Sequence, residues 1–403
     1  MGARAHRAGG LARAHCVVRC LNYGFSVMEI VRAAEFFAGI GLMRLGLEAA
    51  KVETVWANDI EPDKRDIYVA NFGDDEFVLA DIRDISGDSL PDIDIATASF
   101  PCTDLSLAGH RKGLGTAAAP RDETGGSSMF WEFARVLREM KGGRPPVVLL
   151  ENVLGFASSH GGRDLRGAVA ELNRLGYSCD LLAIDARHFV PQSRPRMFIV
   201  GLAEPDPGDL LTDGADRPDW AHRLAFDMPN ARLHTRALPP LPTGPRDLDG
   251  VIERFPPDAV EWWEDERVER FVASLSPIQR TRLETLKRSR KPLWRTAYRR
   301  TRHGVAVWEI RADGIAGCLR TARGGSSKQA LVQAGDGEAR IRWMTPREYA
   351  RLMGAPSFRL DARRNQALFG FGDAVCVPVI SWLCEHYVVP AAAAPLSTLA
   401  EAA

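Results

Sequence analysis

The sequence predicts an α/β protein built on an open, largely parallel sheet, with a smaller and more irregular second domain. From Val31 to Gly201, short apolar runs alternate with segments of helical periodicity, the pattern of repeated strand–helix units. Several runs end in Gly, Asp, Cys or Glu, which form ligand sites at the carboxyl ends of parallel strands. From about Leu202, prolines and charged residues dominate, which indicates a linker and a loop-rich module.

Composition limits the class of protein. The 403 residues are 45% hydrophobic and 26% charged, which suits one large and one smaller globular domain. No apolar run reaches 18 residues, so we predict no membrane span. Seven cysteines without CxxC spacing favour neither a disulfide framework nor a metal site, and we expect a reducing, intracellular setting.

The first predicted unit is a strand at Val31–Phe37, a glycine turn at Ala38–Gly41 and a helix at Leu42–Ala50. Glycines in such a turn let the backbone approach a ligand, although a plain tight turn is the alternative. A second strand, Thr54–Asp59, ends in an acid about 20 residues after the glycines, where an adenosine ribose finds its acceptor. A third unit ends at Ala80–Asp84 with another acid. Together these strand ends favour an adenosine-containing cofactor.

Cys102 follows a buried strand that Pro101 stops, so it lies just past a strand's carboxyl end. A cysteine in a turn there is a candidate nucleophile, and a buried structural cysteine is the alternative. The segment 108–128 is rich in Gly, Ala and charge, and it is too long and polar for a packed connection. We predict a mobile active-site loop there.

A second catalytic candidate follows the next predicted strand. An amphipathic helix at Met129–Met140 precedes a buried strand at Pro146–Leu150, and Glu151 comes at its carboxyl end. Its alternative role is that of a helix N-cap neighbour. A helix at Gly161–Gly176 and a strand at Tyr177–Asp185 complete this part of the chain.

Two arginines lead into the last strand of this region. Arg194 and Arg196 precede a strand at Met197–Gly201 that we expect to be antiparallel, and their alternate positions place both on one side of an extended segment. Farther on, Thr345–Glu348 predicts a helix start with a capping box, and Gly354 predicts its end. An apolar stretch near the C-terminus is expected to be a core helix returning to the first domain.

The net charge is zero, but the distribution of charge is uneven. Gln279–His303 contains ten Lys or Arg residues and one acid, Glu284, with Trp294 and Tyr298 among them. A basic stripe with aromatic residues suits a phosphate backbone, and a solvated helix face is the alternative.

Taken in order, these segments resemble the DNA cytosine-5 methyltransferase family over roughly Ala33 to Val389. Glu35–Gly41 resembles the first motif, which binds S-adenosylmethionine, and Pro101-Cys102 matches the catalytic dipeptide. Glu151–Val153 resembles the family's ENV motif, and Gln192–Arg196 resembles its QxRxR motif. Thr345–Gly354 resembles the ninth motif, and Gly372–Val375 resembles the tenth. The resemblance implies a Rossmann-like S-adenosylmethionine-dependent methyltransferase domain with a smaller, loop-rich target-recognition domain.

The resemblance also implies a reaction: methyl transfer from S-adenosylmethionine to carbon 5 of cytosine in a specific duplex DNA sequence, by base flipping and a covalent Cys102 adduct. The catalytic residues it implies are Cys102, Glu151, Arg194 and Arg196. The cofactor-binding residues it implies are Phe37, Ala38, Gly39, Gly41, Asp59, Ile60, Asp81, Ile82, Pro101, Asp373 and Ala374. We assign DNA contacts to Arg295, Arg299, Arg300, Arg320 and Arg323, and we expect no metal.

The chain departs from the family pattern at three positions. Glu35 stands where the family usually has Asp, Thr103 replaces the usual Gln, and Asp373 replaces the usual Asn. The Gln can fill the gap left by a flipped base, so His110, Arg111 or Lys112 are the candidates for that role here.

The expected organisation has five parts. Residues 1–28, with four Arg and no acid, are a leader expected to be disordered, with a start at Met28 or a transit peptide as alternatives. A catalytic domain (29–201), a target-recognition domain (202–340), a return segment (341–390) and a flexible tail (391–403) follow. We expect a monomer in the cytoplasm, associated with the nucleoid, whose partners are double-stranded DNA and a cognate restriction or defence protein.

Three other functions compete with this interpretation. An RNA (tRNA) cytosine-5 methyltransferase on the same fold is the nearest, and the long recognition region argues for DNA. A non-catalytic DNA-binding protein would not need Cys102, Glu151 and Arg196. A nicotinamide dehydrogenase shares only the glycine turn.

Overall fold

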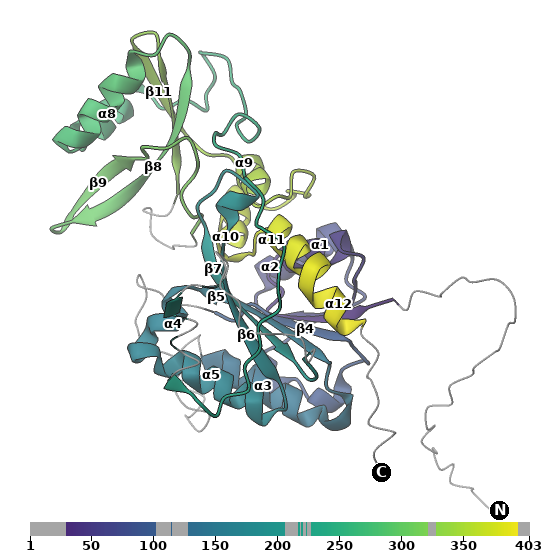
Figure 1. Cartoon of the computed structure of the whole chain (residues 1–403). Coiled ribbons are helices and arrows are strands. Elements are labelled where there is room, and N and C mark those ends of the chain that lie inside the picture. Colours follow the sequence, from purple (N-terminus) through teal and green to yellow (C-terminus); the bar gives the residue numbers. More distant parts are fainter. Residues whose placement is uncertain are drawn as a thin grey trace, which may run out of the picture.

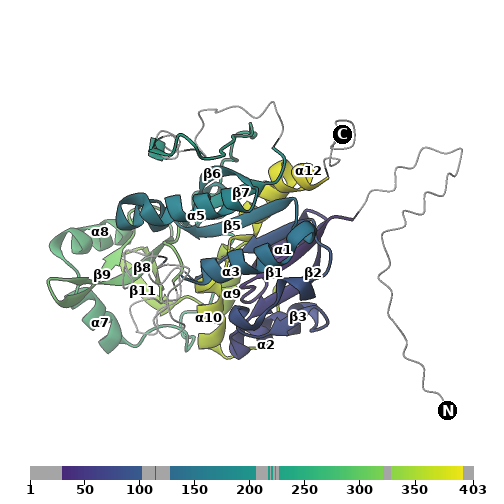
Figure 2. The ribbon, with the colours of Figure 1, turned by 90° about the horizontal axis from the view of Figure 1, so that it is seen from below.

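The computed structural model describes residues 30–101, 114, 128–205, 217, 219–220, 223, 227–320 and 328–393. Within these residues the chain forms two sheets of different size, each with its own helices (Figure 1). The small sheet projects from one side of the large one in both views (Figures 1 and 2).

The large sheet has seven strands in the order β3-β2-β1-β4-β5-β7-β6. Its strands are β1 (Arg32–Phe36), β2 (Glu53–Asp59), β3 (Phe77–Leu79), β4 (Ile95–Ala98), β5 (Val147–Val153), β6 (Ser178–Asp185) and β7 (Pro195–Leu202). The first five are parallel, and β7 runs antiparallel between β5 and β6. The strand order reverses between β1 and β4, and in such sheets ligands bind beyond the carboxyl ends at this switch point.

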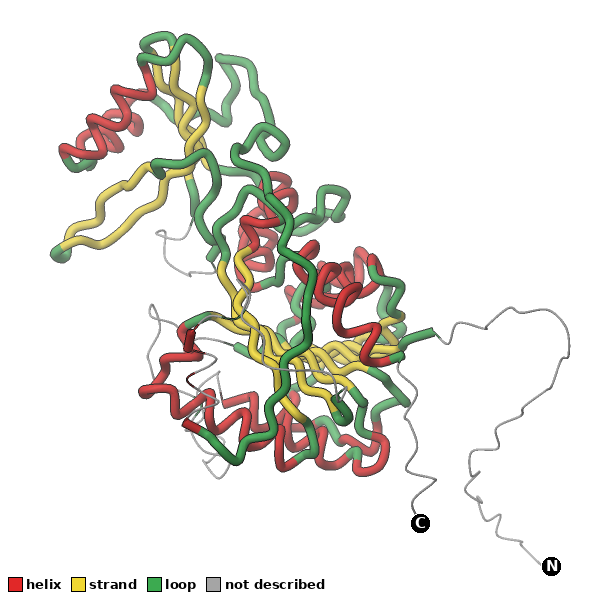
Figure 3. Tube along the Cα trace, in the orientation of Figure 1, coloured by secondary structure: helices red, strands yellow, loops and turns green. Residues whose placement is uncertain are grey.

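Helices cover both faces of the large sheet, which gives three layers (Figure 3). One face carries α1 (Leu42–Ala49), α2 (Pro62–Phe72) and α11 (Val377–Leu383), and the other carries α3 (Met129–Glu139) and α5 (Arg163–Arg174).

The strands contribute side chains to two hydrophobic cores, one on each face of the sheet. Along β5, Val147 and Leu149 enter the core beneath α1, whereas Val148 and Leu150 enter the core above α3. This alternation is the period-two pattern of a strand buried on both faces. Where α1 crosses α11, a Cβ on Gly46 would lie 2.6 Å from the Cβ of Ile380, so this close approach requires glycine.

The small sheet is antiparallel throughout, in the order β11-β10-β8-β9. Its strands and helices are β8 (Leu293–Arg302), β9 (Val305–Ile310), β10 (Ala330–Gly335), β11 (Glu338–Trp343), α7 (Asp265–Ala273) and α8 (Pro277–Lys287). Phe271 of α7 and Leu283 and Leu286 of α8 pack against the sheet and form a separate small core.

Part of this sheet is an unsupported ribbon. Strand β10 pairs with β8 only from Leu293 to Ala297, while the β8–β9 pairing continues to Arg302. The two strands therefore project beyond the third strand, and Figure 1 shows this hairpin extending away from the body of the protein. His303 (φ 50°) and Gly304 (φ 81°) close it, as a two-residue turn with left-handed backbone requires.

The predicted α/β class and most predicted elements are confirmed. The antiparallel β7 is present, and α9 (Pro346–Leu352) begins with the predicted capping box between Thr345 and Glu348. Gly354 follows it with a φ of 77°. One detail is wrong: β5 continues to Val153, so Glu151 lies inside the strand and pairs with Phe198 of β7.

The predicted domain division stays a proposal. Parts of the segment 202–340 pack against the large sheet, and the rest forms the small sheet and its helices. Leu233 forms a bridge to Cys179 beside β6, and Leu248 and Val251 pack in the core beneath α1. Strand β11 runs to Trp343, and α12 (Val389–Ala392) extends into the predicted tail. The predicted leader and most of the predicted tail lie outside the described residues.

One helical stretch passes a length and composition test for a membrane span. It runs from Arg364 to Ala392 and includes α10 (Arg364–Asp373), α11, a π-helical turn (Cys384–Val388) and α12. Most of its apolar window, 72%, is buried inside the protein. Ile380 and Leu383 are fully buried in the core beneath α1, so we assign the stretch to the core of the catalytic domain.

Candidate active site

The turn between β1 and α1 has the backbone shape of a ligand-binding turn. Phe37, Gly39 and Gly41 have φ values of 58°, 59° and 87°, in the left-handed region. A Cβ on Gly41 would lie 2.4 Å from a ring carbon of Phe72, so this position accepts only glycine without rearrangement. The turn is thus held close to α2, with its backbone at the switch point of the sheet.

Asp59, at the end of β2, is fixed beside this turn. Its carboxylate accepts hydrogen bonds from the backbone N–H of Gly39 (2.8 Å) and of Glu61 (2.9 Å). The preceding Asn58 donates to the carbonyls of Val78 and Ala80, which ties the end of β2 to the end of β3. The predicted ribose acceptor therefore lies against the predicted glycine turn.

The neighbouring predicted residues surround the same edge. Ile60, which follows the buried Asp59, is 56% exposed. Asp81 caps a short 3₁₀ turn by accepting from the Arg83 backbone N–H (2.9 Å) and pairs with the Arg83 side chain. Ile82 is buried, and its carbonyl accepts hydrogen bonds from the Ile85 N–H and from Arg135 Nη2 (2.9 Å).

Glu151 forms a buried ion pair with Arg196 across β5 and β7. Arg196 Nε lies 2.9 Å from Glu151 Oε1, and the two side chains are 15% and 7% exposed. Burial raises the pKa of Glu151, although Arg196 and Arg194 oppose this shift. The carboxyl group therefore holds its proton more readily than an exposed glutamate does.

Arg194 is fully buried and binds backbone carbonyls. Its Nη1 donates to the carbonyl of Leu319 (2.9 Å), and its Nη2 donates to the carbonyls of Gly372 (3.0 Å) and Ala374 (2.6 Å). Burial lowers its pKa, and the neighbouring Arg196 adds to this effect. One guanidinium thus links the start of β7 to the predicted tenth motif.

The two arginines converge, as predicted, and they meet at a residue that was not predicted. Arg194 Nη1 lies 3.4 Å and Arg196 Nη2 lies 3.7 Å from Cys318 Sγ. Burial alone would raise the pKa of this thiol, but the two arginines lower it below its ordinary value. No spacing in the sequence distinguishes Cys318, because its neighbours come from a strand more than a hundred residues earlier.

Asn152 connects β5 with the strand end that precedes the predicted nucleophile. Its Nδ2 donates to the carbonyl of Phe100 at 3.1 Å, and β4 pairs with β5 up to Ala98 and Leu150. Pro101 is exposed at this edge. Cys102, Thr103 and the predicted loop candidates His110, Arg111 and Lys112 lie outside the described residues, as does Arg323.

The predicted DNA-contacting arginines differ in how free they are. Arg295 is half-buried, donates to its neighbour's carbonyl and has a pKa lowered by burial. Arg299 forms no hydrogen bond or ion pair with the described residues, Arg300 lies over the Tyr298 ring (4.6 Å), and Arg320 is exposed.

Other cations of the basic stripe are used inside the small domain. Arg282 donates to the carbonyl of Ile310, and Arg302 pairs with Glu309. Only part of the stripe is therefore available to a phosphate backbone.

These features define a class of protein. A doubly wound sheet with a glycine turn and strand-end acids at its switch point, next to a buried carboxyl–guanidinium pair, is the arrangement of a transferase with a nucleotide-type cofactor. The family model for C-5 cytosine-specific DNA methylases matches residues 31–388. The chain belongs to this family and is a DNA cytosine-5 methyltransferase.

Curated relatives align over nearly the whole chain. The type II methyltransferase M.HhaI of Haemophilus parahaemolyticus is 27% identical over 88% of this chain and 94% of its own length. M.NlaX of Neisseria lactamica is 30% identical over 87% of this chain and 94% of its own length. Among solved structures, a DNMT2 variant from Spodoptera frugiperda covers 88% of this chain and 98% of its own, with 17% identity and a TM-score of 0.56, which shows the fold.

Proposed function

We propose that this methyltransferase uses S-adenosylmethionine to methylate carbon 5 of a flipped cytosine in duplex DNA, through a covalent adduct with Cys102. The observation that supports this most is the buried Glu151–Arg196 pair. It lies at the same sheet edge as Pro101, since Asn152 ties that strand end to β5. A carboxyl group, a guanidinium and a strand-end cysteine are the groups that this addition needs.

The residues at the switch point fit S-adenosylmethionine. Asp59 offers its carboxylate to a ribose beside the glycine turn, and Asp81 offers a second acid at the next strand end. The exposed Ile60 side chain provides an apolar surface for the adenine. The cofactor supplies a methyl group activated on a sulfonium.

Cysteine addition solves a chemical difficulty. Carbon 5 of cytosine is a poor nucleophile, and addition of a thiolate at carbon 6 turns the ring into an enamine-like nucleophile. Glu151 holds N3 and the exocyclic amine, and because its pKa is raised it retains a proton to share with N3 more readily than an exposed glutamate would. After methyl transfer a base removes the carbon 5 proton and Cys102 leaves as the thiolate.

Arg196 and Arg194 set the electrostatics of this pocket. Arg196 fixes the Glu151 carboxyl by its 2.9 Å contact. Arg194 holds the return segment in place through the carbonyls of Gly372 and Ala374. We therefore assign Arg196 to the base-binding pocket and Arg194 to positioning the pocket's wall.

The projecting ribbon is the part of the small domain best shaped for DNA. A two-stranded β-ribbon fits the major groove of B-DNA. Arg299 and Arg300 stand on opposite faces of this ribbon, because neighbouring residues of a strand alternate in direction. With Arg320 they form our proposed set of DNA contacts, while the lid at residues 108–128 stays a prediction from sequence.

The biological setting follows from the relatives. The relatives M.HhaI, M.Bsp6I and M.NlaX are type II methyltransferases, so we propose a role in a restriction–modification system. We propose that the protein acts as a monomer on chromosomal DNA in the cytoplasm. A restriction or defence protein would be its genetic partner. The alternative substrate is tRNA.

Labelled methyl transfer to DNA and to RNA tests the proposal. The purified chain, incubated with methyl-labelled S-adenosylmethionine, should label duplex DNA, and digestion to nucleosides should yield 5-methylcytosine. Bisulfite sequencing of the product then identifies the recognised site. Label in tRNA with none in DNA would overturn the DNA assignment, and label on another atom or base would overturn the chemistry.

A further inference from the structure

Asp373 stands in an unfavourable electrostatic position. It is the last residue of α10, whose carbonyl end carries partial negative charge, so a carboxylate there is repelled and an amide would be tolerated better. The carbonyls on either side of it, those of Gly372 and Ala374, accept hydrogen bonds from Arg194. The backbone at Asp373 is thus fixed, and its side chain cannot move far from the helix end.

Lys64 compensates for this charge. Its Nζ lies 3.4 Å from Asp373 Oδ2, and it extends from the first turn of α2, next to the strand end that carries Asp59. Burial lowers the pKa of Lys64, but the carboxylates of Asp59, Asp373 and Glu61 outweigh burial and raise it above its ordinary value. Lys64 thus contacts Asp373 directly, and its charge also acts on the nearby carboxylates of Asp59 and Glu61.

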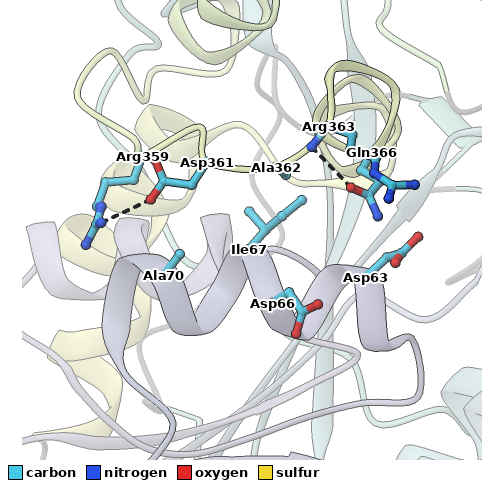
Figure 4. Close-up of a pocket in the computed structure, with 9 residues that line it drawn as sticks. All are labelled: Asp63, Asp66, Ile67, Ala70, Arg359, Asp361, Ala362, Arg363 and Gln366. Carbon is cyan, nitrogen blue, oxygen red and sulfur yellow. Dashed lines mark hydrogen bonds and ion pairs between the residues drawn. The ribbon is translucent and has the colours of Figure 1, made fainter.

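The same segment meets α2 at a second point. Asn71, at the other end of α2, donates to the Arg359 carbonyl (3.3 Å) and accepts from the Arg359 N–H (2.8 Å). Between these two attachments an open surface pocket of about 240 Å³ lies between the helix and the segment leading into α10 (Figure 4).

We propose that Lys64 is a positioning residue of the cofactor site, which latches the return segment onto α2 through Asp373 and offsets the charge of the surrounding carboxylates. The residue pair accounts for the Asp at a position where an Asn was expected, because the carboxylate needs a cation and the chain provides one 309 residues away in sequence. The proposal rests on the assignment of this edge as the S-adenosylmethionine site.

The arrangement predicts unequal effects of the two single substitutions. In Lys64→Met, the Asp373 carboxylate stays at the carbonyl end of α10 with no cation beside it, so its repulsion should disturb the adjacent cofactor site and weaken cofactor binding by about three- to tenfold. In Asp373→Asn, the charge that Lys64 compensates is absent, so binding should change by less than about twofold. The double variant should bind nearly as well as Asp373→Asn, because the lysine has lost the partner it must neutralise.

Equilibrium binding of S-adenosylmethionine to the full chain, measured by calorimetry, tests this pattern together with the Tm of each variant. Lys141→Met, which removes an exposed pair with Asp88 far from this edge, is the matched control and should bind normally. If Lys64→Met fails to fold at the assay temperature, Lys64→Arg and the double variant carry the test, and both must bind.

Equal losses in Lys64→Met and the double variant would overturn the proposal, as would normal binding by Lys64→Met. Asp59→Ala separates this failure from failure of the cofactor assignment. If Asp59→Ala loses binding while Lys64→Met does not, only the latch is wrong. If the unaltered chain does not bind S-adenosylmethionine, or if Asp59→Ala binds as tightly as the unaltered chain, the assignment of this edge is wrong, and the latch proposal with it.

Discussion

Glu151→Gln should separate the chemical role of the Glu151–Arg196 pair from its structural role. Glutamine has the same shape and keeps an oxygen for Arg196 Nε, which now lies 2.9 Å from the Glu151 carboxylate. It cannot hold a titratable proton for N3 of the cytosine. The substitution therefore removes the chemistry while it preserves most of the packing.

The expected magnitudes differ for rate and for stability. Loss of a positioned acid typically costs about 10²- to 10⁴-fold in rate, which corresponds to about 3–5 kcal/mol of transition-state stabilisation. The free energy of unfolding should fall by only about 1–3 kcal/mol, since one charged hydrogen bond is replaced by a neutral one. Single-turnover methyl transfer and chemical denaturation measure the two quantities separately.

Glu171→Gln provides the control. Glu171 is also a buried glutamate paired with arginines, Arg138 and Arg174, but it lies on α5 away from the sheet edge that carries the site. The Glu171→Gln variant should be less stable than the unaltered enzyme but should keep its single-turnover rate. A Glu151→Gln variant whose rate stays within about threefold of the unaltered enzyme would refute the role that we assign to Glu151.

The single-turnover rate should also depend on pH through this group. The raised pKa of Glu151 means that the protonated form persists to higher pH than in an exposed glutamate. If that form is the active one, the rate falls as pH rises through the raised pKa, and Glu151→Gln lacks this fall. A fall of the same shape in the variant would assign the pH dependence to another group.

Three further predictions concern other parts of the molecule. Glu35 is buried, and burial raises its pKa to about 8 against the opposing effect of Arg44. A group whose pKa is higher in the folded than in the unfolded state stabilises the folded protein at low pH. The free energy of unfolding should therefore fall by about 4–5 kcal/mol as pH rises from about 4.5 to 8. Chemical denaturation of Glu35→Gln should lack this fall. Replacing Arg299 and Arg300 by Ala should reduce the salt slope of DNA binding by about one to two, whereas Arg302→Gln, whose cation Glu309 already neutralises, should leave it unchanged. Gly41→Ala should cost about 2–4 kcal/mol in stability, because its Cβ would meet Phe72 at 2.4 Å, and Gly304→Ala, with positive φ but open space, should cost only about 1–2 kcal/mol.

Local sequence patterns predicted the parts of the fold that depend on neighbours along the chain. The glycine turn, the acid that follows it and the Thr345 capping box depend on residues close in sequence, and the structure confirms each as a local feature. The basic stripe was recognised by composition, but its arrangement as a helix and a projecting ribbon was not, because charge composition has no periodicity.

The contacts that complete the site join residues far apart in the chain. Arg194 reaches the carbonyls of Leu319 and Ala374, and Lys64 reaches Asp373. Burial and hydrogen-bond demand determine these pairs, and neither leaves a spacing signal in the sequence. The position of Glu151 within β5 was missed for a similar reason, since only pairing with β7 shows where the strand ends.

The central claim is the covalent addition of Cys102 to cytosine. Duplex DNA carrying 5-fluorocytosine at the recognised site, incubated with the enzyme and S-adenosylmethionine, should yield a denaturation-resistant complex, and peptide mass spectrometry should place the attachment on Cys102. Cys102→Ala should form no such complex, whereas Cys318→Ala should still form it. Attachment at Cys318, or methyl transfer by Cys102→Ala at the unaltered rate, would contradict the account.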